Sequence, residues 1–441
     1  MAKDDSSVEV KGDVKGTAYG VSATGNSTID VGGNVESELR SVNAGRDSSV
    51  SVGGNVTSAT QEGVIANNQS QVTVAGSVKS EGEAVRASGN SSVSIGGNAE
   101  SDGPTINAYD NSTVSIGGNV INTDSAGAGV SAHNNSTVNV SGDVTTPGVG
   151  VWAENSSTVT VGGNVEADEM FAASAGSGST VTVEGNAVNK SSDAVSVSDN
   201  GKVTVKGDAT GERYGIYISE SGNSSDGAAV VLGTVTAGDN NDSYCINVSS
   251  DALTKQEVLD ELPTIIVGEL SSKNGQFVNF TDNSGQGTLD SKEVAQAIAE
   301  QILYYIDVQD TKNGNIKIDS GTSKVEGYDV AHASDTVTVT VTADRGYEIQ
   351  TVGGGKATAV KNEDGSWNIT VPATGGVSIS AIMAAIRQVE DNSGGGGDDG
   401  GNTNTKTNDP PEYVSEKTAD GSSVHVYGET TAPDGTAVVV F

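Results

Sequence analysis

The sequence has little of what stabilises a protein through covalent bonds or a thick core. Its 441 residues include one cysteine, Cys245, and only 4% aromatic residues. A single cysteine excludes an intrachain disulfide and supplies too few thiols for a structural zinc site. No apolar run reaches the ~18 residues of a membrane-spanning helix, so we expect no membrane insertion. Stability must therefore come from the packing of a narrow core.

Positive charge is also scarce. The chain has 23 Lys and Arg residues against 58 Asp and Glu residues, which gives a formal net charge of -35. Such a field repels nucleic acid and anionic lipid, so we expect neither as a partner. The first residues, Met-Ala-Lys-Asp-Asp, lack the basic and apolar regions of a signal peptide. We expect the sequence to be part of a longer secreted protein whose export signal and anchor lie outside it.

Glycine is abundant, and most glycines recur at fixed positions of a tandem repeat. The repeat reads S-x-V-x-V-x-G-N-V, and most copies start about 21 residues apart. The copies begin at Ser6, Ser27, Ser48, Ser70, Ser91, Ser112, Ser136, Ser157, Ser179 and Gly201. This regular spacing predicts a solenoid, not a disordered chain.

Each copy alternates Val or Ile with polar residues, which is typical of a strand with one buried face. In one copy, Val159 and Val161 are expected to point inward, and Gly162-Gly163-Asn164 to turn the corner through positive φ angles. A second short element, Gly-Val-x-Ala in several copies, recurs just upstream. Each repeat therefore supplies at least two strands, and about ten coils stacked at about 4.8 Å share one core.

The corner of each coil carries a polar residue after the glycine. Stacked above one another, these side chains are expected to form a hydrogen-bond ladder along the solenoid, as architecture and not as a metal site. The positions are Asp13, Asn34, Asn55, Ser77, Asn98, Asn119, Asp143, Asn164, Asn186 and Asp208.

With these repeats the chain resembles the right-handed parallel β-helix group, in particular the Asn- and Gly-rich coils of bacterial secreted adhesins and surface proteins. The resemblance covers about residues 6–240, is architectural, and brings no catalytic residue with it. It implies a mainly β chain in which residues 1–250 form a parallel β-helix of about ten coils of about 21 residues.

Beyond residue 250 the repeat gives way to other patterns. Thr254 and Glu257 form a capping-box pattern that predicts a short helix ended by Pro263, and Asp290–Ile306 reads as a second helix. Open solenoid ends expose unpaired strand edges. We therefore expect residues 251–303 to be a helical cap and connector that covers the last coil.

Residues 304–387 read as a small β-domain. Strands are expected at Thr336–Thr342 and Val377–Ala381, with a G-Y-x-I turn entry and a D-G-S-W hairpin between them. The succession resembles the internalin-type B repeat and related repeat domains of Gram-positive surface proteins, which implies spacing or binding at a cell surface. The Gly- and Asp-rich residues 388–408 are expected to be a flexible linker, and 409–441 part of a further β-module or a tail.

One segment fits the spacing of an EF-hand calcium loop. Its ligands would be Asp282, Ser284, Gln286, Asp290 and Glu293. Ser and Gln are weaker ligands than carboxylates, and the preceding residues read as a strand where an EF-hand has a helix. The alternative is an acidic loop that caps a helix. Ca²⁺ is the one cofactor that the sequence suggests.

Catalytic groups are poorly placed for an enzyme. Enzymes that hydrolyse glycosidic bonds need paired carboxylates on one face. Asp168 and Glu169 are adjacent, so they point to opposite sides if the chain is extended. The three histidines, His133, His332 and His425, fall in different segments, and the first is expected to be solvated at a corner.

Aromatic residues offer a candidate binding surface. Trp152 and Tyr217 occupy the central, outward position of the same recurring element, and Tyr109 and Phe171 lie nearby in register. Exposed rings on a rod can stack on sugar rings, as amphipathic rings do at recognition surfaces. The alternative is ordinary packing of these rings against loops.

The sequence therefore favours a non-catalytic, extracellular, adhesin-type protein of a Gram-positive bacterium, secreted or attached to the cell surface. It would act as a monomer and present a β-helical rod to a glycan or to a host or matrix protein. Two alternatives stay open: a carbohydrate-active β-helix enzyme, either a polysaccharide lyase or a hydrolase, and a purely structural stalk.

Overall fold

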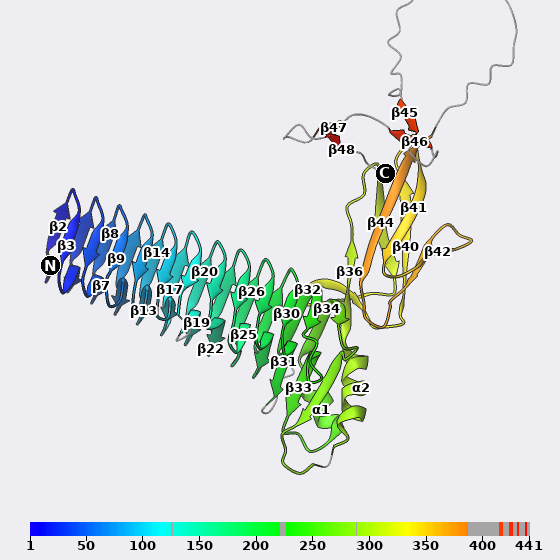
Figure 1. Ribbon diagram of the computed structural model, residues 1–441, viewed down its shortest axis with the longest axis horizontal. Coiled ribbons are helices and arrows are strands. Elements are labelled where there is room, and N and C mark those ends of the chain that lie inside the picture. Colours follow the sequence, from blue (N-terminus) through cyan, green and yellow to red (C-terminus); the bar gives the residue numbers. More distant parts are fainter. Residues whose placement is uncertain are drawn as a thin grey trace, which may run out of the picture. The chain divides into compact units, whose positions relative to one another are not determined.

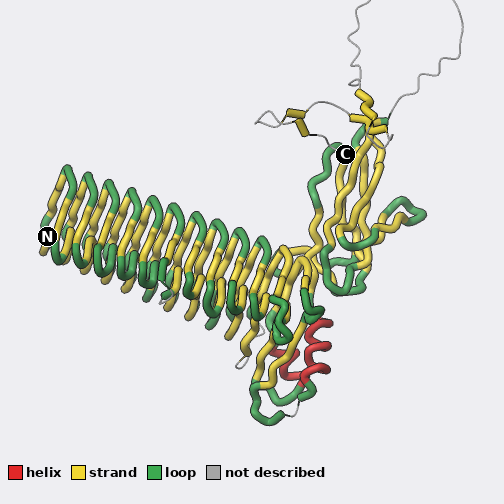
Figure 2. Tube along the Cα trace, viewed as in Figure 1, coloured by secondary structure: helices red, strands yellow, loops and turns green. Residues whose placement is uncertain are grey.

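Three short strands in each repeat build one coil of a solenoid. The computed structural model describes residues 1–124, 127–220, 226–287 and 289–386, together with the backbone of four short strands further on. Residues 1–386 form one unit and residues 387–441 another. In the first unit the coils stack in parallel, as the ribbon in Figure 1 and the strand segments in Figure 2 show. The predicted parallel β-solenoid is confirmed.

The first sheet joins the strands that carry the Gly-Val-x-Ala element. It has 13 strands within the described residues, each paired in parallel with the equivalent strand of the next coil. The strands are β1 (Ala2–Lys3), β4 (Tyr19–Thr24), β7 (Arg40–Gly45), β10 (Val64–Asn67), β13 (Val85–Ser88), β16 (Ile106–Ala108), β19 (Ala128–His133), β22 (Val149–Glu154), β25 (Phe171–Ala175), β28 (Asp193–Ser198), β31 (Tyr214–Glu220), β33 (Tyr244–Ser250) and β35 (Val278–Asp282).

Two further parallel ladders complete each coil. The second ladder holds the V-x-V strands β2 (Ser7–Val10), β5 (Thr28–Val31), β8 (Ser49–Val52), β11 (Gln71–Val74), β14 (Ser92–Ile95), β17 (Thr113–Ile116), β20 (Thr137–Val140), β23 (Thr158–Val161), β26 (Thr180–Val183) and β29 (Lys202–Val205). The third holds β3 (Val14–Gly16), β6 (Val35–Ser37), β9 (Val56–Ser58), β12 (Val78–Ser80), β15 (Ala99–Ser101), β18 (Val120–Asn122), β21 (Val144–Thr146), β24 (Val165–Ala167), β27 (Ala187–Asn189) and β30 (Ala209–Gly211). Two longer strands, β32 (Ala228–Ala237) and β34 (Thr264–Ser272), continue both ladders.

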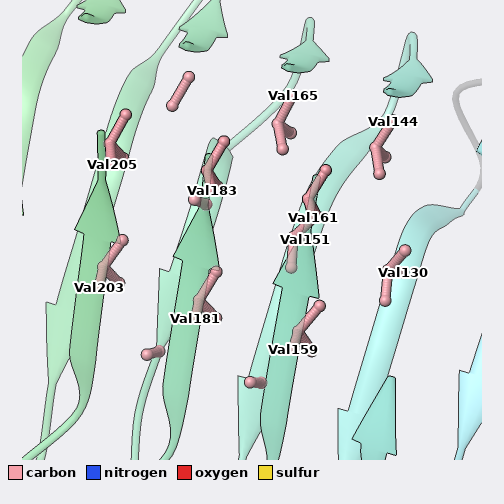
Figure 3. Packing of buried hydrophobic residues seen from close by; sticks show 14 of the residues in the cluster. Val130, Val144, Val151, Val159, Val161, Val165, Val181, Val183, Val203 and Val205 are labelled. Atoms are coloured by element: carbon pink, nitrogen blue, oxygen red, sulfur yellow. The ribbon is translucent and has the colours of Figure 1, made fainter. Parts of the chain in front are cut away.

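The core is a column of aliphatic side chains along the solenoid. Val159 and Val161 are fully buried, as predicted, while Thr158 and Thr160 face outward. Each buried valine lies in register with its equivalent in the next coil, for example Val159 with Val181 and Val181 with Val203. Figure 3 shows this stacking. One coil cannot bury such residues alone, so each coil depends on its neighbours.

The corner after the V-x-V strand uses glycine because there is no space for a side chain. The second corner position is glycine in eleven successive coils, from Gly12 to Gly233. A Cβ atom on Gly185 would lie 2.5 Å from Oδ1 of Asn164 and 2.8 Å from the carbonyl oxygen of Gly163, both in the preceding coil. The ladder side chain of one coil therefore occupies the space that the glycine of the next coil leaves open.

Positive φ angles occur at a different corner. The prediction that Gly162-Gly163-Asn164 turns through positive φ is wrong, because these residues keep negative φ. Pairs of left-handed residues instead precede the V-x-V strands, such as Asn134 and Asn135 with φ of 57° and 59°. Asn tolerates this conformation better than most residues with a side chain, which explains why it recurs there.

The predicted polar ladder is present, and it joins side chain to backbone. The amide of Asn34 donates to Oδ1 of Asp13 at 2.7 Å, and equivalent bonds link every following step up to Thr234, which donates to Asp208. A serine ladder runs in the opposite direction. The amide of Ser157, for example, donates to Oγ of Ser179 in the next coil at 3.0 Å. Each coil is thus bonded to its neighbours through side chains at two of its corners.

The parallel ladders run past the expected boundary at residue 250. β34 pairs in register with β32, and β35 with β33, so the solenoid continues to Asp282. The helix α1 (Lys255–Glu261) connects β33 to β34, and α2 (Ser291–Gln301) follows β35; the predicted residues Thr254 and Asp290 are their N-caps. α2 is shorter than predicted because the chain becomes extended at Ile302.

The β-domain that follows shares its first strand with the solenoid. β36 (Leu303–Val308) pairs in parallel with β34 and, further along, with β44. The other strands are β37 (Gly314–Ser320), β38 (Ser323–Val325), β39 (Tyr328–Ala331), β40 (Thr336–Ala343), β41 (Tyr347–Gly355), β42 (Ala359–Lys361), β43 (Trp367–Thr370) and β44 (Val377–Ala385). The strands expected at Thr336–Thr342 and Val377–Ala381 are confirmed as β40 and β44.

A second, smaller core fixes this domain to the solenoid. Outward positions of the V-x-V ladder are polar in most coils but apolar in the last ones, where they hold Ala228, Val230 and Ile266. The β38–β39 hairpin covers them with Val330, which is fully buried. Burial of these residues accounts for the loss of polar residues at the end of the repeat.

Residues 387–441 contribute four described strands. β45 (Val414–Lys417) pairs with β46 (Ser423–Val426), and β47 (Thr430–Thr431) pairs with β48 (Ala437–Val438), both antiparallel. The predicted linker over residues 388–408 lies outside the described residues.

Candidate functional site

The outer surface of the first sheet differs from the other two surfaces of the solenoid. The seven aromatic residues before residue 250 all lie on it or at its edge, and we call this surface the aromatic face. They are Tyr19, Tyr109, Trp152, Phe171, Tyr214, Tyr217 and Tyr244. In this part of the chain Arg40, Arg86 and Arg213 also belong to it, whereas the lysines other than Lys3 lie on the other two ladders or their corners.

Four rings form a continuous cluster across successive coils of this face. Tyr109 stacks on His133 with ring centroids 5.3 Å apart, and His133 contacts Trp152 edge to face at 5.1 Å. Phe171 extends the cluster, and its ring centroid lies 6.4 Å from that of Trp152. Alternation in β22 turns Trp152 outward between the buried residues Val151 and Ala153. The predicted outward position of Trp152 is confirmed. Tyr109 and Phe171 lie near it, but not in register with it as predicted, because Trp152 pairs with Ser131 and Ser174.

His133 differs from its expected state. It was predicted to be solvated at a corner, yet its side chain is only 16% exposed. It is held between Tyr109 and Trp152, and its Nδ1 lies 3.7 Å from Oε2 of Glu154. No local pattern indicates this contact, because it joins residues of adjacent coils across an insertion in the repeat.

Tyr217 belongs to a second aromatic group on the same face. It stacks on Tyr214 with ring centroids 5.8 Å apart. The guanidinium of Arg213 lies over both rings, 4.8 Å from the centroid of Tyr214 and 5.7 Å from that of Tyr217. Arg213 also makes two hydrogen bonds to the buried carboxylate of Asp193, at 2.9 Å and 2.6 Å. Sequence reasoning missed Asp193 and Arg213, which lie 20 residues apart in adjacent coils.

Glu62 and Glu83 are neighbouring carboxylates of this face with opposite properties. Burial acts to raise the pKa of Glu62, but the hydrogen bond from Arg40 at 2.7 Å and further contacts lower it below the ordinary value. Burial raises the pKa of Glu83. The positive charge of Arg86 and the hydrogen bond from Asn107 act to lower this pKa, but the effect of burial is larger. Carboxylates with divergent pKa values are what an acid–base enzyme needs. They are the pair that the enzyme alternative would use.

The opposite shifts predict opposite effects of neutral substitutions on stability. The raised pKa of Glu83 costs stability as pH rises from the ordinary 4.5 through the folded-state value, so Glu83→Gln is expected to stabilise the protein at neutral pH but not below pH 4.5. The lowered pKa of Glu62 has the reverse sign, so Glu62→Gln should destabilise it at neutral pH, with the difference vanishing in acid. Guanidinium denaturation of both variants across pH measures this. A Glu83→Gln protein that is less stable at neutral pH would contradict it.

The predicted calcium ligands are engaged separately. Oδ1 of Asp282 accepts hydrogen bonds from the backbone and side chain of Ser284, at 2.8 Å and 2.5 Å. Asp290 caps α2, and Glu293 forms an ion pair with Lys255 at 2.6 Å. Gln286 is exposed, and its backbone N–H donates a hydrogen bond to Oγ of Ser284. Within the described residues no three His, Cys, Asp or Glu side chains lie close enough to share a metal ion. Calcium binding here stays a prediction that would need Asp290 and Glu293 to rearrange.

Other candidate groups lie apart from one another. Asp168 forms an ion pair with Lys190 at 3.3 Å, while its neighbour Glu169 is exposed. Nδ1 of His332 lies 3.3 Å from the carbonyl oxygen of Ile302, and the side chain of His425 is outside the described structure. No helix in the described segments has the length and apolar character needed to cross a membrane.

Comparison with protein-family models, with curated proteins and with solved structures finds no match to this chain. The fold is therefore established by the strand pairing, and the likeness to adhesins and to internalin-type repeats stays an interpretation of the sequence.

Proposed function

We propose that this chain is a non-catalytic, extracellular binding protein of the adhesin type, which uses the aromatic face of its solenoid to hold a glycan or a host or matrix protein. The observation that carries this role is the gathering of every aromatic residue before residue 250 on one face or at its edge. Tyr, Trp and Arg are the residues enriched at recognition surfaces, because they combine a large contact area with polar groups.

An exposed location is supported by the chemistry of the rest of the chain. A net charge of -35 keeps a densely displayed protein soluble. Burial raises the pKa of the single thiol, Cys245, to about 11, so it presents no reactive thiolate to an oxidising environment. The β-domain over residues 304–387, with its likeness to repeat domains of Gram-positive surface proteins, would serve as a spacer.

Replacement of Trp152 by Ala should weaken ligand binding about tenfold, because it removes the largest aromatic ring of the face. The full chain is screened against a glycan array and against immobilised matrix proteins, and the affinity for each ligand found is then measured by calorimetry. Thr160→Ala is the matched control, since Thr160 faces outward on the second ladder, away from the aromatic face. Its binding should equal that of the wild type.

The same ligands distinguish the alternatives. Release of reducing ends from a bound polysaccharide, lost in Glu83→Gln, would replace the binding role by an enzymatic one. Absence of binding to every glycan and matrix protein would leave the structural stalk. Saturable binding without product, weakened by Trp152→Ala and not by Thr160→Ala, is the expected result.

A further inference from the structure

The two aromatic groups of the face lie at a defined separation along the solenoid. Trp152 and Tyr217 occupy the same row, because Trp152 pairs with Ser174, Ser174 with Ser196, and Ser196 with Tyr217. Three coil steps separate the two rings, which corresponds to about 14 Å along the axis. A ligand that contacts both rings must therefore be an elongated molecule lying parallel to the axis.

Between the two groups the row holds only small hydroxyl residues. Ser174 and Ser196 occupy this row in the two intervening coils; Ser196 is half-buried, and Ser174 is only 7% exposed. A hydroxyl group offers one hydrogen-bond donor and two acceptor sites. Two apolar rings that flank a short hydroxyl-bearing stretch match a sugar chain, whose rings have apolar faces and hydroxyl edges. A peptide segment would instead be recognised by apolar pockets or by a free sheet edge, which this row does not provide.

The guanidinium beside this row is already paired. Arg213 makes two hydrogen bonds to the carboxylate of Asp193. No cationic side chain of the row between Trp152 and Tyr217 is therefore free to pair with a sulfate or carboxylate group of a ligand, and the net charge of -35 repels such groups at longer range. The surface fits an uncharged ligand.

The rings at both ends are held in position before a ligand arrives. Arg213 braces Tyr214 and Tyr217, which are stacked with an interplanar angle of 16°. Trp152 is fixed between His133 and Phe171. Side chains that are already ordered lose little entropy on binding, which favours recognition of a weakly interacting ligand such as a neutral sugar.

We infer that the ligand of the aromatic face is an uncharged oligosaccharide, which lies along the solenoid axis and contacts Trp152 at one end and Tyr217 at the other. This inference rests on the proposed binding function and narrows its ligand class.

The test uses the full chain and calorimetric titration with defined sugars. Cellohexaose, maltohexaose, mannohexaose and chitohexaose are the neutral probes, and hexagalacturonate and a heparin hexasaccharide are the acidic ones. We expect one or more neutral hexasaccharides to bind, with about tenfold loss in Trp152→Ala and again in Tyr217→Ala. The disaccharide of the bound sugar is too short to reach both rings, so at most one of the two substitutions should weaken its binding.

Two variants make the result specific to stacking. Tyr217→Phe keeps the ring and should retain most of the affinity, whereas Tyr217→Ala should not. Tyr19→Ala removes a ring of the same face several coils away, outside the proposed span, and should bind as the wild type does. Far-ultraviolet circular dichroism of each variant checks that the β-solenoid is intact.

The outcomes separate this inference from the proposed function. Binding only of acidic sugars, only of matrix proteins, or of a hexasaccharide that ignores Tyr217→Ala would overturn the inference and leave the binding function in place. Absence of binding to all sugars and all matrix proteins would overturn both.

Discussion

Gly185→Ala is expected to lower the free energy of unfolding by about 3 kcal/mol, although it adds a single methyl group. The new Cβ atom would lie 2.5 Å from Oδ1 of Asn164 and 2.8 Å from the carbonyl oxygen of Gly163. Neither can move freely, because Asn164 accepts the amide hydrogen of Asn186 at 2.9 Å and Gly163 belongs to the corner of the preceding coil. The substitution therefore combines overpacking with loss of a ladder hydrogen bond.

Gly12→Ala is the matched control for this prediction. Gly12 occupies the same position of the repeat, but nothing lies within 4 Å of its added Cβ atom. Its substitution should change stability by less than about 0.5 kcal/mol, or raise it slightly through the unfolded state. Guanidinium denaturation gives the midpoints, and hydrogen exchange around residue 185 locates the loss. Equal midpoints for the two variants would show that close approach of coils is not what requires glycine.

The repeat allowed the solenoid to be predicted, but not the reason for its glycines. Alternation around Val159 and Val161 was sufficient to predict strands and their inward face, because the period of a strand is a local property. The polar ladder followed from the common spacing of Asn34, Asn55 and their equivalents. The role of Gly185 depends on its distance from the preceding coil, and no local sequence pattern specifies that distance.

The candidate site was predictable one residue at a time, but not as an arrangement. Outward positions of Trp152 and Tyr217 followed from alternation within single strands. The contact of His133 with Tyr109 joins residues 24 apart, across an insertion in the repeat, and the Arg213–Asp193 pair joins residues 20 apart. Contacts across coils depend on the length of every intervening corner, so they needed the structure.

The end of the solenoid was the least predictable region. The expected helical cap over residues 251–303 contains two further strands, because α1 and α2 interrupt the repeat spacing without ending the parallel ladders. One signal was present in the sequence. The outward positions Ala228, Val230 and Ile266 are apolar where earlier coils are polar, which indicates that another element covers them.

Val330→Asp is expected to release the β38–β39 hairpin from the solenoid. Val330 is fully buried against Ala228, Val230 and Ile266, so a carboxylate there would be a buried charge with no partner. Such a substitution costs about 4 kcal/mol, so we expect the hairpin to detach from the solenoid surface. Lys324, in the strand β38, should then become a rapid cleavage site for trypsin, because proteases need an unpaired segment.

Ser323→Asp separates the effect of burial from that of added charge. Ser323 lies directly opposite Val330 in the hairpin but is exposed, so the same carboxylate should leave Lys324 as resistant as in the wild type. The coils far from the junction should keep their hydrogen-exchange protection in both variants, since each coil is stabilised by its immediate neighbours. Equal cleavage at Lys324 in Val330→Asp and the wild type would show that this small core does not hold the hairpin, and that the pairing of β39 with β36 is sufficient.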